Sequence, residues 1–332
     1  MKKLTSPYVI AEIGINHEGD ISLAKRLISD AIYSGAQAVK FQVFEPETIM
    51  GPKMQKHKDI KNKKGSFIKN KAKKLYISNR QLLELKKFSK KNKIQFGCSI
   101  FDKNSLERVA KIKVDYLKIA SSDINDIYLL KLVKKTKIPC IISTGMANLK
   151  EIKRAVKILG NPVVLHCVSR YPCEINEANL KRIETLKKNL SVKVGYSDHT
   201  VGINACKIAI MMGVQVIEKH FTYDKLKGGD HALSANKDDL KNLIEFSKDF
   251  KKYMGAGSIT PSKKELNNKK IFRKGLYFAK DFLKGEKIKL QDIKILRPEN
   301  KFKIENYGKI IGKVLKKNVK KFSPIKSNYF KK

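Results

Sequence analysis

The chain lacks several features that would place it at once in a narrow class of protein. Tryptophan is absent, and only eight of the 72 basic residues are arginine. The five cysteines are an odd number, form no C-x-x-C pair and lie mostly in apolar strand-like runs, which predicts reduced core thiols instead of a disulfide framework. No stretch approaches the roughly 18 uninterrupted apolar residues of a membrane span, and Glu12 interrupts the start before a signal-peptide core can form. These absences predict a cytoplasmic protein with no membrane partner.

The composition that is present is that of a folded protein. Hydrophobic residues make up 42% of the 332 residues and charged residues 31%, which excludes a collagen-like, mucin-like or wholly disordered chain. A chain of this length is expected to form roughly two domains.

The formal net charge of +41 suggests a nucleic-acid partner, because Lys and Arg neutralise phosphates. Arginine, which binds guanine and phosphate bidentately, is scarce, and lysine is spread over the whole chain. Only 53–74 and the stretch from Lys313 onward are dense in lysine. We interpret the excess as a solvated surface and expect no specific nucleic-acid partner. A lysine-rich polyanion-binding protein stays open as an alternative of a different class.

Short β-rich runs alternate with longer runs of helical periodicity as far as about residue 250. Strands are expected at 8–14, 37–43, 94–99, 115–120, 139–143, 162–167, 192–197 and 214–219. Helices are expected at 20–34, 79–92, 103–112, 125–136, 148–159, 176–189, 200–212 and 237–252. This alternation predicts a (β/α)8 TIM barrel, whose active site forms at the carboxyl ends of its strands. A doubly wound sheet is the alternative, but no G-x-G-x-x-G follows the first strand.

The domain organisation follows from changes in composition along the chain. The barrel is expected to span 1–254, and the lysine-rich connection at 44–78 is long enough to form a flap over its mouth. The polar, turn-rich stretch 255–271 is typical of a linker. The remaining residues, 272–332, predict a small mixed module that can lend residues to an enzyme.

Polar side chains interrupt the apolar strands near their carboxyl ends, where burial without a partner is costly. Lys40 and Gln42 are two residues apart on the second strand and therefore share a face. Polar residues also lie at or just after the ends of four other strands. They are Glu12, Asn16 and His17 for the first strand, Ser99 for the third, Lys118, Ser121 and Asp123 for the fourth, and Ser143 and Thr144 for the fifth. Hydroxyls repeated beside two lysines predict an anion site. The alternative for a buried lysine is a salt bridge with an acid on a neighbouring strand.

Two histidines close the series. His199 follows the seventh strand and His220 ends the eighth, and neighbouring strands lie about 4.8 Å apart, so both rings can reach one ion. Two imidazoles with open positions suit a divalent ion such as Mn²⁺. The alternative is a structural, hydrogen-bonded histidine. Three further histidines are weaker candidates, His17, His166 and His231, and His57 lies in the lysine-dense loop.

The motifs AEIGINHEGD, AVKFQVF, YLKIASSD, IISTGM, LHCVSRYP, GYSDHT and EKHFT occur in this order. Together they resemble the sialic acid synthase (N-acetylneuraminate synthase) family. The tail, with RKGLYFAKDFLKGEKI and ILRP, resembles the antifreeze-like SAF domain of that family, a small α+β domain of the β-clip type. The resemblance implies condensation of phosphoenolpyruvate (PEP) with an open-chain N-acetylated hexosamine and water, which gives a nine-carbon 2-keto-3-deoxy sugar acid and releases phosphate by C–O cleavage.

The resemblance also implies a role for each matching position. The metal ligands match His199 and His220, with Mn²⁺ as the expected ion and Mg²⁺ or Co²⁺ as alternatives. The PEP contacts match Lys40, Ser99, Lys118, Ser121, Ser143, Ser169 and Ser197. The sugar contacts match Gln42, Asp123, Tyr171 and Asp230. Glu12 or Asp123 would accept a proton. Arg297 matches an arginine that enters the barrel of the other subunit, which implies a domain-swapped homodimer.

Several positions depart from the family pattern. Asp123 stands where Glu is more usual, Ser99 where Thr is commoner, and Ser169 where some members have Asn. KGGDH is one residue shorter than usual, and Glu299 replaces a glycine after Arg297-Pro298. These changes affect the sugar side most, so N-acetylmannosamine and a diacetamido-trideoxyhexose both stay open as substrates. A different PEP-condensing barrel would not need the tail, and a Schiff-base aldolase would use Lys40 or Lys118 as nucleophile.

Overall fold

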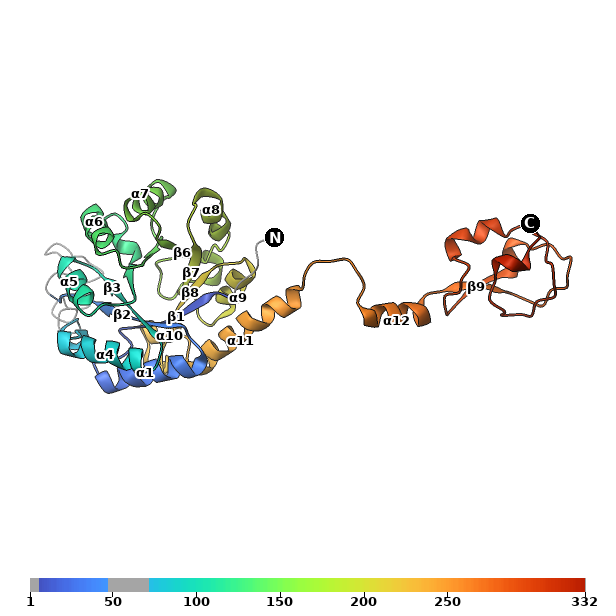
Figure 1. Ribbon diagram of the computed structural model, residues 1–332. Helices are drawn as coiled ribbons and strands as arrows, with labels where there is room; N and C mark the ends of the chain where they lie inside the picture. Colours follow the sequence, from blue (N-terminus) through green and yellow to red (C-terminus); the bar gives the residue numbers. More distant parts are fainter. Residues whose placement is uncertain (1–5, 47–71, 332) are drawn as a thin grey trace. The chain divides into compact units, whose positions relative to one another are not determined.

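The computed structural model describes residues 6–46 and 72–331 of the chain. It divides into two compact units, Met1–Gly255 and Ala256–Lys332 (Figure 1). The division follows Gly255, at the start of the stretch expected to be a linker. The flap expected over 44–78 falls largely on residues 47–71, and His57 and most of the lysine-dense zone fall there too, outside the described residues.

The first unit is a closed barrel of parallel strands. In order they are β1 (Tyr8–Gly14), β2 (Ala38–Val43), β3 (Gln95–Ile100), β4 (Tyr116–Ile119), β5 (Cys140–Ser143), β6 (Val163–Cys167), β7 (Val194–Asp198) and β8 (Val216–His220). Each strand pairs with the next, and β8 closes on β1 with Tyr8 opposite Val216 and Glu12 opposite His220. The predicted (β/α)8 barrel is confirmed, and the doubly wound sheet is wrong because the sheet has no open edge.

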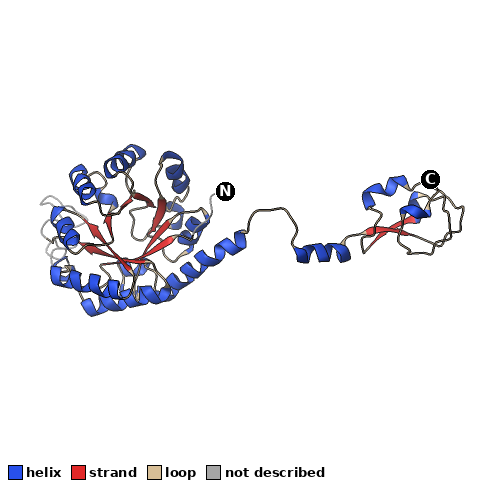
Figure 2. Ribbon diagram, in the orientation of Figure 1, coloured by secondary structure: helices blue, strands red, loops and turns tan. Residues whose placement is uncertain are grey.

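Helices surround the strands, as Figure 2 shows. They are α1 (Ile21–Ser34), α4 (Asn79–Lys91), α5 (Lys103–Lys111), α6 (Ile127–Thr136), α7 (Leu149–Leu159), α8 (Arg182–Asn189), α9 (Asn204–Met211), α10 (Asp230–Leu233) and α11 (Lys237–Met254). Short 3₁₀ helices are η2 (Ser121–Asp123), η3 (Ile175–Glu177) and η4 (Lys225–Lys227). Side-chain caps fix several starts, such as Asp20 before α1 and the Ser78–Gln81 capping box of α4. The helix expected at 176–189 is shorter, because η3 occupies its first residues.

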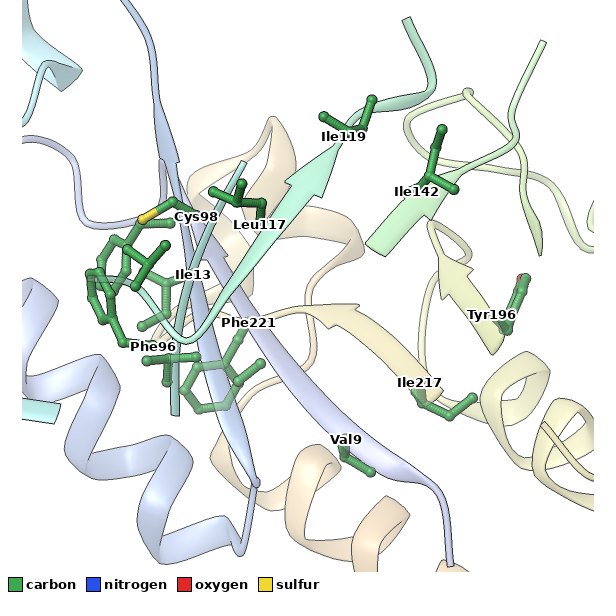
Figure 3. Close-up of a cluster of buried hydrophobic side chains, with 14 of the residues drawn as sticks. Val9, Ile13, Phe96, Cys98, Leu117, Ile119, Ile142, Tyr196, Ile217 and Phe221 are labelled. Carbon is green, nitrogen blue, oxygen red and sulfur yellow. The ribbon is translucent and has the colours of Figure 1, made fainter. Parts of the chain in front are cut away.

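The strand residues that face the helices form the main hydrophobic core. Val9, Phe96, Leu117 and Ile217 belong to this layer, which is drawn in Figure 3. A smaller apolar cluster comprises Ile10, Ala38, Tyr116, Ile141, Leu165 and Val216. Most of its members lie two residues before a polar strand-end residue and therefore on the same, inner face of the strand. They fill the lower part of the barrel and leave the carboxyl end for polar side chains.

Glycine makes room for the largest side chain of this inner cluster. The Tyr116 ring lies against Gly97 of β3, inside the barrel. Its hydroxyl donates to the Val39 carbonyl at 3.2 Å. A Cβ on Gly97 would lie 2.1 Å from the Tyr116 ring. Position 97 must therefore be glycine as long as tyrosine fills the barrel floor.

The second unit has its own small core. Strands β9 (Gly275–Phe278) and β10 (Ile293–Leu296) pair antiparallel, and 3₁₀ helices η5 (Leu290–Asp292), η6 (Ile304–Lys309) and η7 (Ser327–Tyr329) accompany them. The expected linker contains a helix, α12 (Lys263–Phe272), which begins at a Ser262–Glu265 capping box. This S-x-x-E signal is in the sequence, but the surrounding polar residues favoured a linker instead.

Two predictions about absent features can be compared with the described residues. All five cysteines are described and are free thiols, four of them buried, as predicted. Within 6–46 and 72–331, no helix has the length and apolar character needed to cross a membrane.

Candidate active site

The carboxyl ends of the barrel strands enclose a cavity of about 350 Å³. Most of the residues predicted for the site line it: Glu12, Lys40, Gln42, Ser99, Lys118, Ser121, Ser143, Ser169, Tyr171, Ser197, His199, His220 and Asp230. Asp123 lies on η2, next to the lining residues Ser121 and Ser122, and accepts a hydrogen bond from the Ser122 hydroxyl at 3.0 Å. The topology therefore brings side chains from all eight strands or the loops after them to one place.

Two buried lysines form the centre of the cavity. The Lys40 ammonium lies 3.1 Å from Glu12 Oε2 and 3.4 Å from Glu218 Oε2, and it donates to Ser99 Oγ at 2.8 Å. The Lys118 ammonium lies 3.7 Å from Glu218 Oε1. The salt bridge considered for a buried lysine is thus present, and it does not exclude an anion site, because an anion can replace the carboxylate contacts.

Glu218 was missed in the sequence analysis. Its carboxylate contacts both lysines and accepts a hydrogen bond from Ser197 Oγ at 2.8 Å. It is buried, and its Oε2 makes no hydrogen bond to the described residues. The signal was available, because Glu218 lies two residues before His220 and so shares its face of β8.

The two glutamates of the cavity have opposite pKa shifts. Burial raises the pKa of Glu12 to about 7, although Lys40 opposes the shift. Burial also acts to raise the pKa of Glu218, but Lys118 and Lys40 lower it to about 2. Carboxyl pairs whose pKa values are pushed apart mark acid–base assignments. Glu12 can therefore gain or lose a proton near neutral pH, whereas Glu218 stays ionised.

His199 and His220 lie side by side, with ring centroids 5.3 Å apart. His199 Nδ1 lies 2.7 Å from the Val168 carbonyl oxygen. Because a carbonyl only accepts, Nδ1 carries a proton, and in the neutral ring Nε2 keeps a lone pair, the arrangement usual for a metal-binding histidine. Burial acts to lower the pKa of His199, but Cys167 and the Val168 carbonyl raise it overall. Burial keeps the pKa of His220 well below its usual value, so this ring is neutral.

The donor set fits a divalent ion. His220 Nδ1 is buried and has no hydrogen-bond partner in the described part of the chain, which marks an orphaned polar atom in the cavity. Residues 6–46 and 72–331 contain no group of three or more His, Cys, Asp or Glu side chains that could hold a metal ion. The protein would then supply two imidazole ligands, and water or substrate oxygens would complete the coordination. Tyr171 covers His199 with ring centroids 4.0 Å apart.

Small residues leave space for the serine hydroxyls. The Gly145 amide donates to Ser121 Oγ at 3.0 Å. A Cβ on Gly145 would lie 2.2 Å from Ser169 Oγ and 2.8 Å from Ser121 Oγ. Ser143 Oγ is buried without a hydrogen-bond partner among the described residues. The serine side of the cavity can therefore offer hydroxyl groups to a bound anion.

Other polar residues singled out in the sequence have structural partners. Asn16 donates to the Phe221 carbonyl and to Ser234 Oγ, both at 3.0 Å. His17 Nδ1 accepts from the Gly19 amide at 3.0 Å, and His166 Nε2 lies 2.8 Å from the Ala178 carbonyl. His231 Nδ1 lies 2.6 Å from Thr222 Oγ1. These contacts satisfy part of the hydrogen-bonding capacity of each residue, whereas Asn16 Oδ1 and His17 Nε2 are buried without a partner among the described residues.

Arg297 belongs to the second unit, directly after β10. Its guanidinium lies 6.0 Å from the centre of the Phe272 ring at the end of α12. The peptide bond from Arg297 to Pro298 is cis. Arg297 therefore belongs to the small unit Ala256–Lys332 and not to the barrel.

Comparisons with known proteins match both units. The sequence model of the NeuB family matches residues 27–259, and that of the SAF domain matches residues 273–328. The N,N'-diacetyllegionaminic acid synthase of Legionella pneumophila is 36% identical over 94% of this chain and 91% of its own length. A pseudaminic acid synthase of Campylobacter jejuni is 32% identical over 97% of this chain and 96% of its own length. A crystal structure of N-acetylneuraminic acid synthetase from Leptospira borgpetersenii in complex with citrate superimposes with a TM-score of 0.71 and 35% identity, covering 80% of this chain and 90% of that one.

Proposed function

The chain belongs to the NeuB family, and from that premise we propose that it condenses PEP with an N-acetylated amino sugar and water to a nine-carbon 2-keto-3-deoxy acid and phosphate. In this reaction C3 of PEP forms a bond to the sugar aldehyde carbon. Water adds at C2, and the C2–O bond to phosphate breaks. The named relatives are synthases of nonulosonic acids, which supports this reaction class.

The observation that carries the proposal is the buried lysine pair beside the two histidines. Lys40 and Lys118 supply positive charge in a cavity of about 350 Å³ whose serine hydroxyls can bind phosphate and carboxylate oxygens. Glu218 compensates part of that charge in the free chain. A protonated Glu12 leaves Glu218 as the one ionised carboxylate in contact with the two lysines among the described residues, which favours an anionic substrate beside the lysines.

The mechanism assigns the remaining residues by position. A divalent ion held by His199 and His220 would supply Lewis-acid polarisation of the sugar aldehyde, and Mn²⁺ is our proposal for its identity. Gln42 donates to Glu12 Oε1 at 3.2 Å and so orients the carboxyl that takes up or releases a proton. Tyr171 and Asp230 line the cavity where we place the hydroxyls of the sugar.

The amino sugar that we propose is a 2,4-diacetamido-trideoxyhexose. The relatives named N,N'-diacetyllegionaminic acid synthase support this choice, with 36% identity for the enzyme of L. pneumophila and 38% for that of C. jejuni. Asp123 in place of the more usual Glu agrees with a sugar other than N-acetylmannosamine. A pseudaminate-type stereoisomer is the second candidate, on the 32% identity to the pseudaminic acid synthase.

We also propose a domain-swapped homodimer in which each chain contributes Arg297 to the barrel of the other. The planar guanidinium can bind sugar oxygens or a carboxylate bidentately, which lysine cannot do. Only eight of the 72 basic residues are arginine, so an arginine at this position favours a specific contact.

The function is tested by phosphate release from PEP with Mn²⁺, in the presence of N-acetylmannosamine or a 2,4-diacetamido-trideoxyhexose. We expect release that requires a sugar and stops with chelator, with the diacetamido sugar preferred. His220→Ala should abolish turnover and leave thermal unfolding near that of the wild type. Phosphate release that is equally fast without either sugar would contradict the proposal, and so would full activity in His220→Ala. Trapping of pyruvate by borohydride would instead indicate a Schiff-base aldolase.

A further inference from the structure

A fully buried ion pair lies directly behind the cavity. The Lys219 ammonium is 2.8 Å from Asp198 Oδ2, and neither side chain is exposed. Ser197 and Glu218, the preceding residues on β7 and β8, line the cavity, so Asp198 and Lys219 point to the opposite face of the sheet. A buried ion pair is weak evidence for stability, because an apolar pair of similar volume does as well or better. Its presence here therefore needs another explanation.

Most contacts of this pair end on the segment around His199; the exception is the Cys206 thiol of α9, which donates to Asp198 Oδ2 at 3.2 Å. Asp198 Oδ1 accepts hydrogen bonds from the Tyr196 hydroxyl and the Thr200 amide, each at 2.9 Å. Lys219 also donates a hydrogen bond to the Thr200 carbonyl. The residues on both sides of His199 are thus fixed to β8 through the Lys219 side chain.

The pairing of β7 with β8 does not include His199, whose carbonyl accepts a hydrogen bond from the Cys173 amide at 2.9 Å. Strand β7 ends at Asp198, so His199 lies just beyond the ladder, whereas His220 is the last residue of β8. Asp198 and Lys219 are the last residues that β7 and β8 pair with each other. Each member of the ion pair directly precedes one of the two histidines.

From this arrangement we propose that the Asp198–Lys219 pair is a positioning device that holds the His199 and His220 rings at the separation needed to bind one divalent cation. This role rests on the metal site of the proposed function. The pair itself contacts neither the cavity nor the cation. It acts by locking the turn after β7 to the end of β8, so that the ring separation of 5.3 Å does not drift.

The test is the affinity of the full chain for Mn²⁺, measured without turnover by electron paramagnetic resonance of the free ion. We expect Lys219→Met and Asp198→Asn each to weaken Mn²⁺ binding about tenfold. Tyr196→Phe removes a single hydrogen bond to Asp198 and should weaken Mn²⁺ binding measurably but by less than about tenfold. In these variants excess Mn²⁺ should restore kcat, and KM for PEP should stay near the wild-type value.

Two controls separate positioning from a general loss of stability. Asp115→Asn breaks the ion pair with Lys86 at 2.6 Å, at the amino end of the barrel, and weakens the hydrogen bond from the Phe96 amide by removing the charge of its acceptor. It should lower Tm and leave Mn²⁺ affinity unchanged. The double variant Asp198→Asn with Lys219→Met should regain Tm relative to the single variants, because no unpaired charge remains buried, and yet bind Mn²⁺ weakly.

Wild-type Mn²⁺ affinity in Lys219→Met and Asp198→Asn would overturn the positioning role and leave the proposed function intact. If these two variants do not fold, wild-type affinity in the milder Tyr196→Phe would overturn it. His220→Ala reports on the metal site itself. Wild-type Mn²⁺ binding in that variant, or none in the unaltered chain, would refute the proposed metal site and this role with it.

Discussion

Replacing Glu218 by Gln removes the carboxylate that lies between the two buried lysines of the cavity. The variant keeps the shape of the side chain and can still contact Ser197, but Lys118 loses its charged partner at 3.7 Å and Lys40 loses one at 3.4 Å. The fall in the pKa of Glu218 from 4.5 to about 2 corresponds to about 3 kcal/mol. Breaking a buried ion pair costs a similar amount, about 3–5 kcal/mol. We therefore expect the free energy of unfolding at pH 7 to fall by about 3 kcal/mol.

Differential scanning calorimetry checks this magnitude, since a loss of about 3 kcal/mol lowers Tm by about 6–12 °C in a domain of this size. The pKa of Glu218 is lower in the folded chain than its ordinary value of 4.5, so its stabilising effect is complete above pH 4.5 and is lost as pH falls towards about 2. The difference between wild type and variant should shrink over that range. Glu84→Gln, which breaks an exposed pair with Lys25 at 2.5 Å, is the matched control and should leave Tm unchanged. A Glu218→Gln variant as stable as this control would refute the reasoning.

Three further predictions concern binding and assembly. Burial raises the pKa of Glu12 to about 7, so titration calorimetry should show PEP affinity falling as pH rises from 6 to 8, and Glu12→Gln should remove most of that dependence. Gly145→Ala should raise the Kd for PEP at least about tenfold, because its Cβ would lie 2.2 Å from a serine hydroxyl; Gly308→Ala, in open space, is the control for the binding assay. In a domain-swapped dimer, inactive Arg297→Ala and His220→Ala chains should regain activity when unfolded together and refolded as a mixture, and a mixture that stays inactive would argue against the swap.

The barrel was predictable because its signals are local and repeated. β1 begins and ends at the expected residues, and the other strands begin or end within two residues of the expected positions. The apolar alternation of each strand is set by packing against the helices on one side and the barrel interior on the other. The start of α8 was not predictable in this way, because 3₁₀ turns such as η3 carry a similar periodicity to a helix.

The cavity was predictable as a set of strand-end residues but not as a network of charges. Lysines and histidines stood out because they interrupt apolar runs, whereas Glu218 lies between apolar residues and two stronger signals, Lys219 and His220. Only the closed barrel shows that Glu218 faces Lys40, which lies far away in the sequence. Lys219 illustrates the converse, because strand alternation turns it away from the cavity and pairs it with Asp198.

The most direct test of the proposed reaction follows the oxygen that bridges carbon and phosphorus in PEP. PEP labelled with ¹⁸O at this bridge is incubated with Mn²⁺ and the diacetamido sugar, and the products are analysed by mass spectrometry. We expect the label to leave with phosphate, because the C–O bond breaks, and the new keto oxygen to come from water. Unlabelled phosphate, or labelled phosphate formed equally well without a sugar, would contradict it.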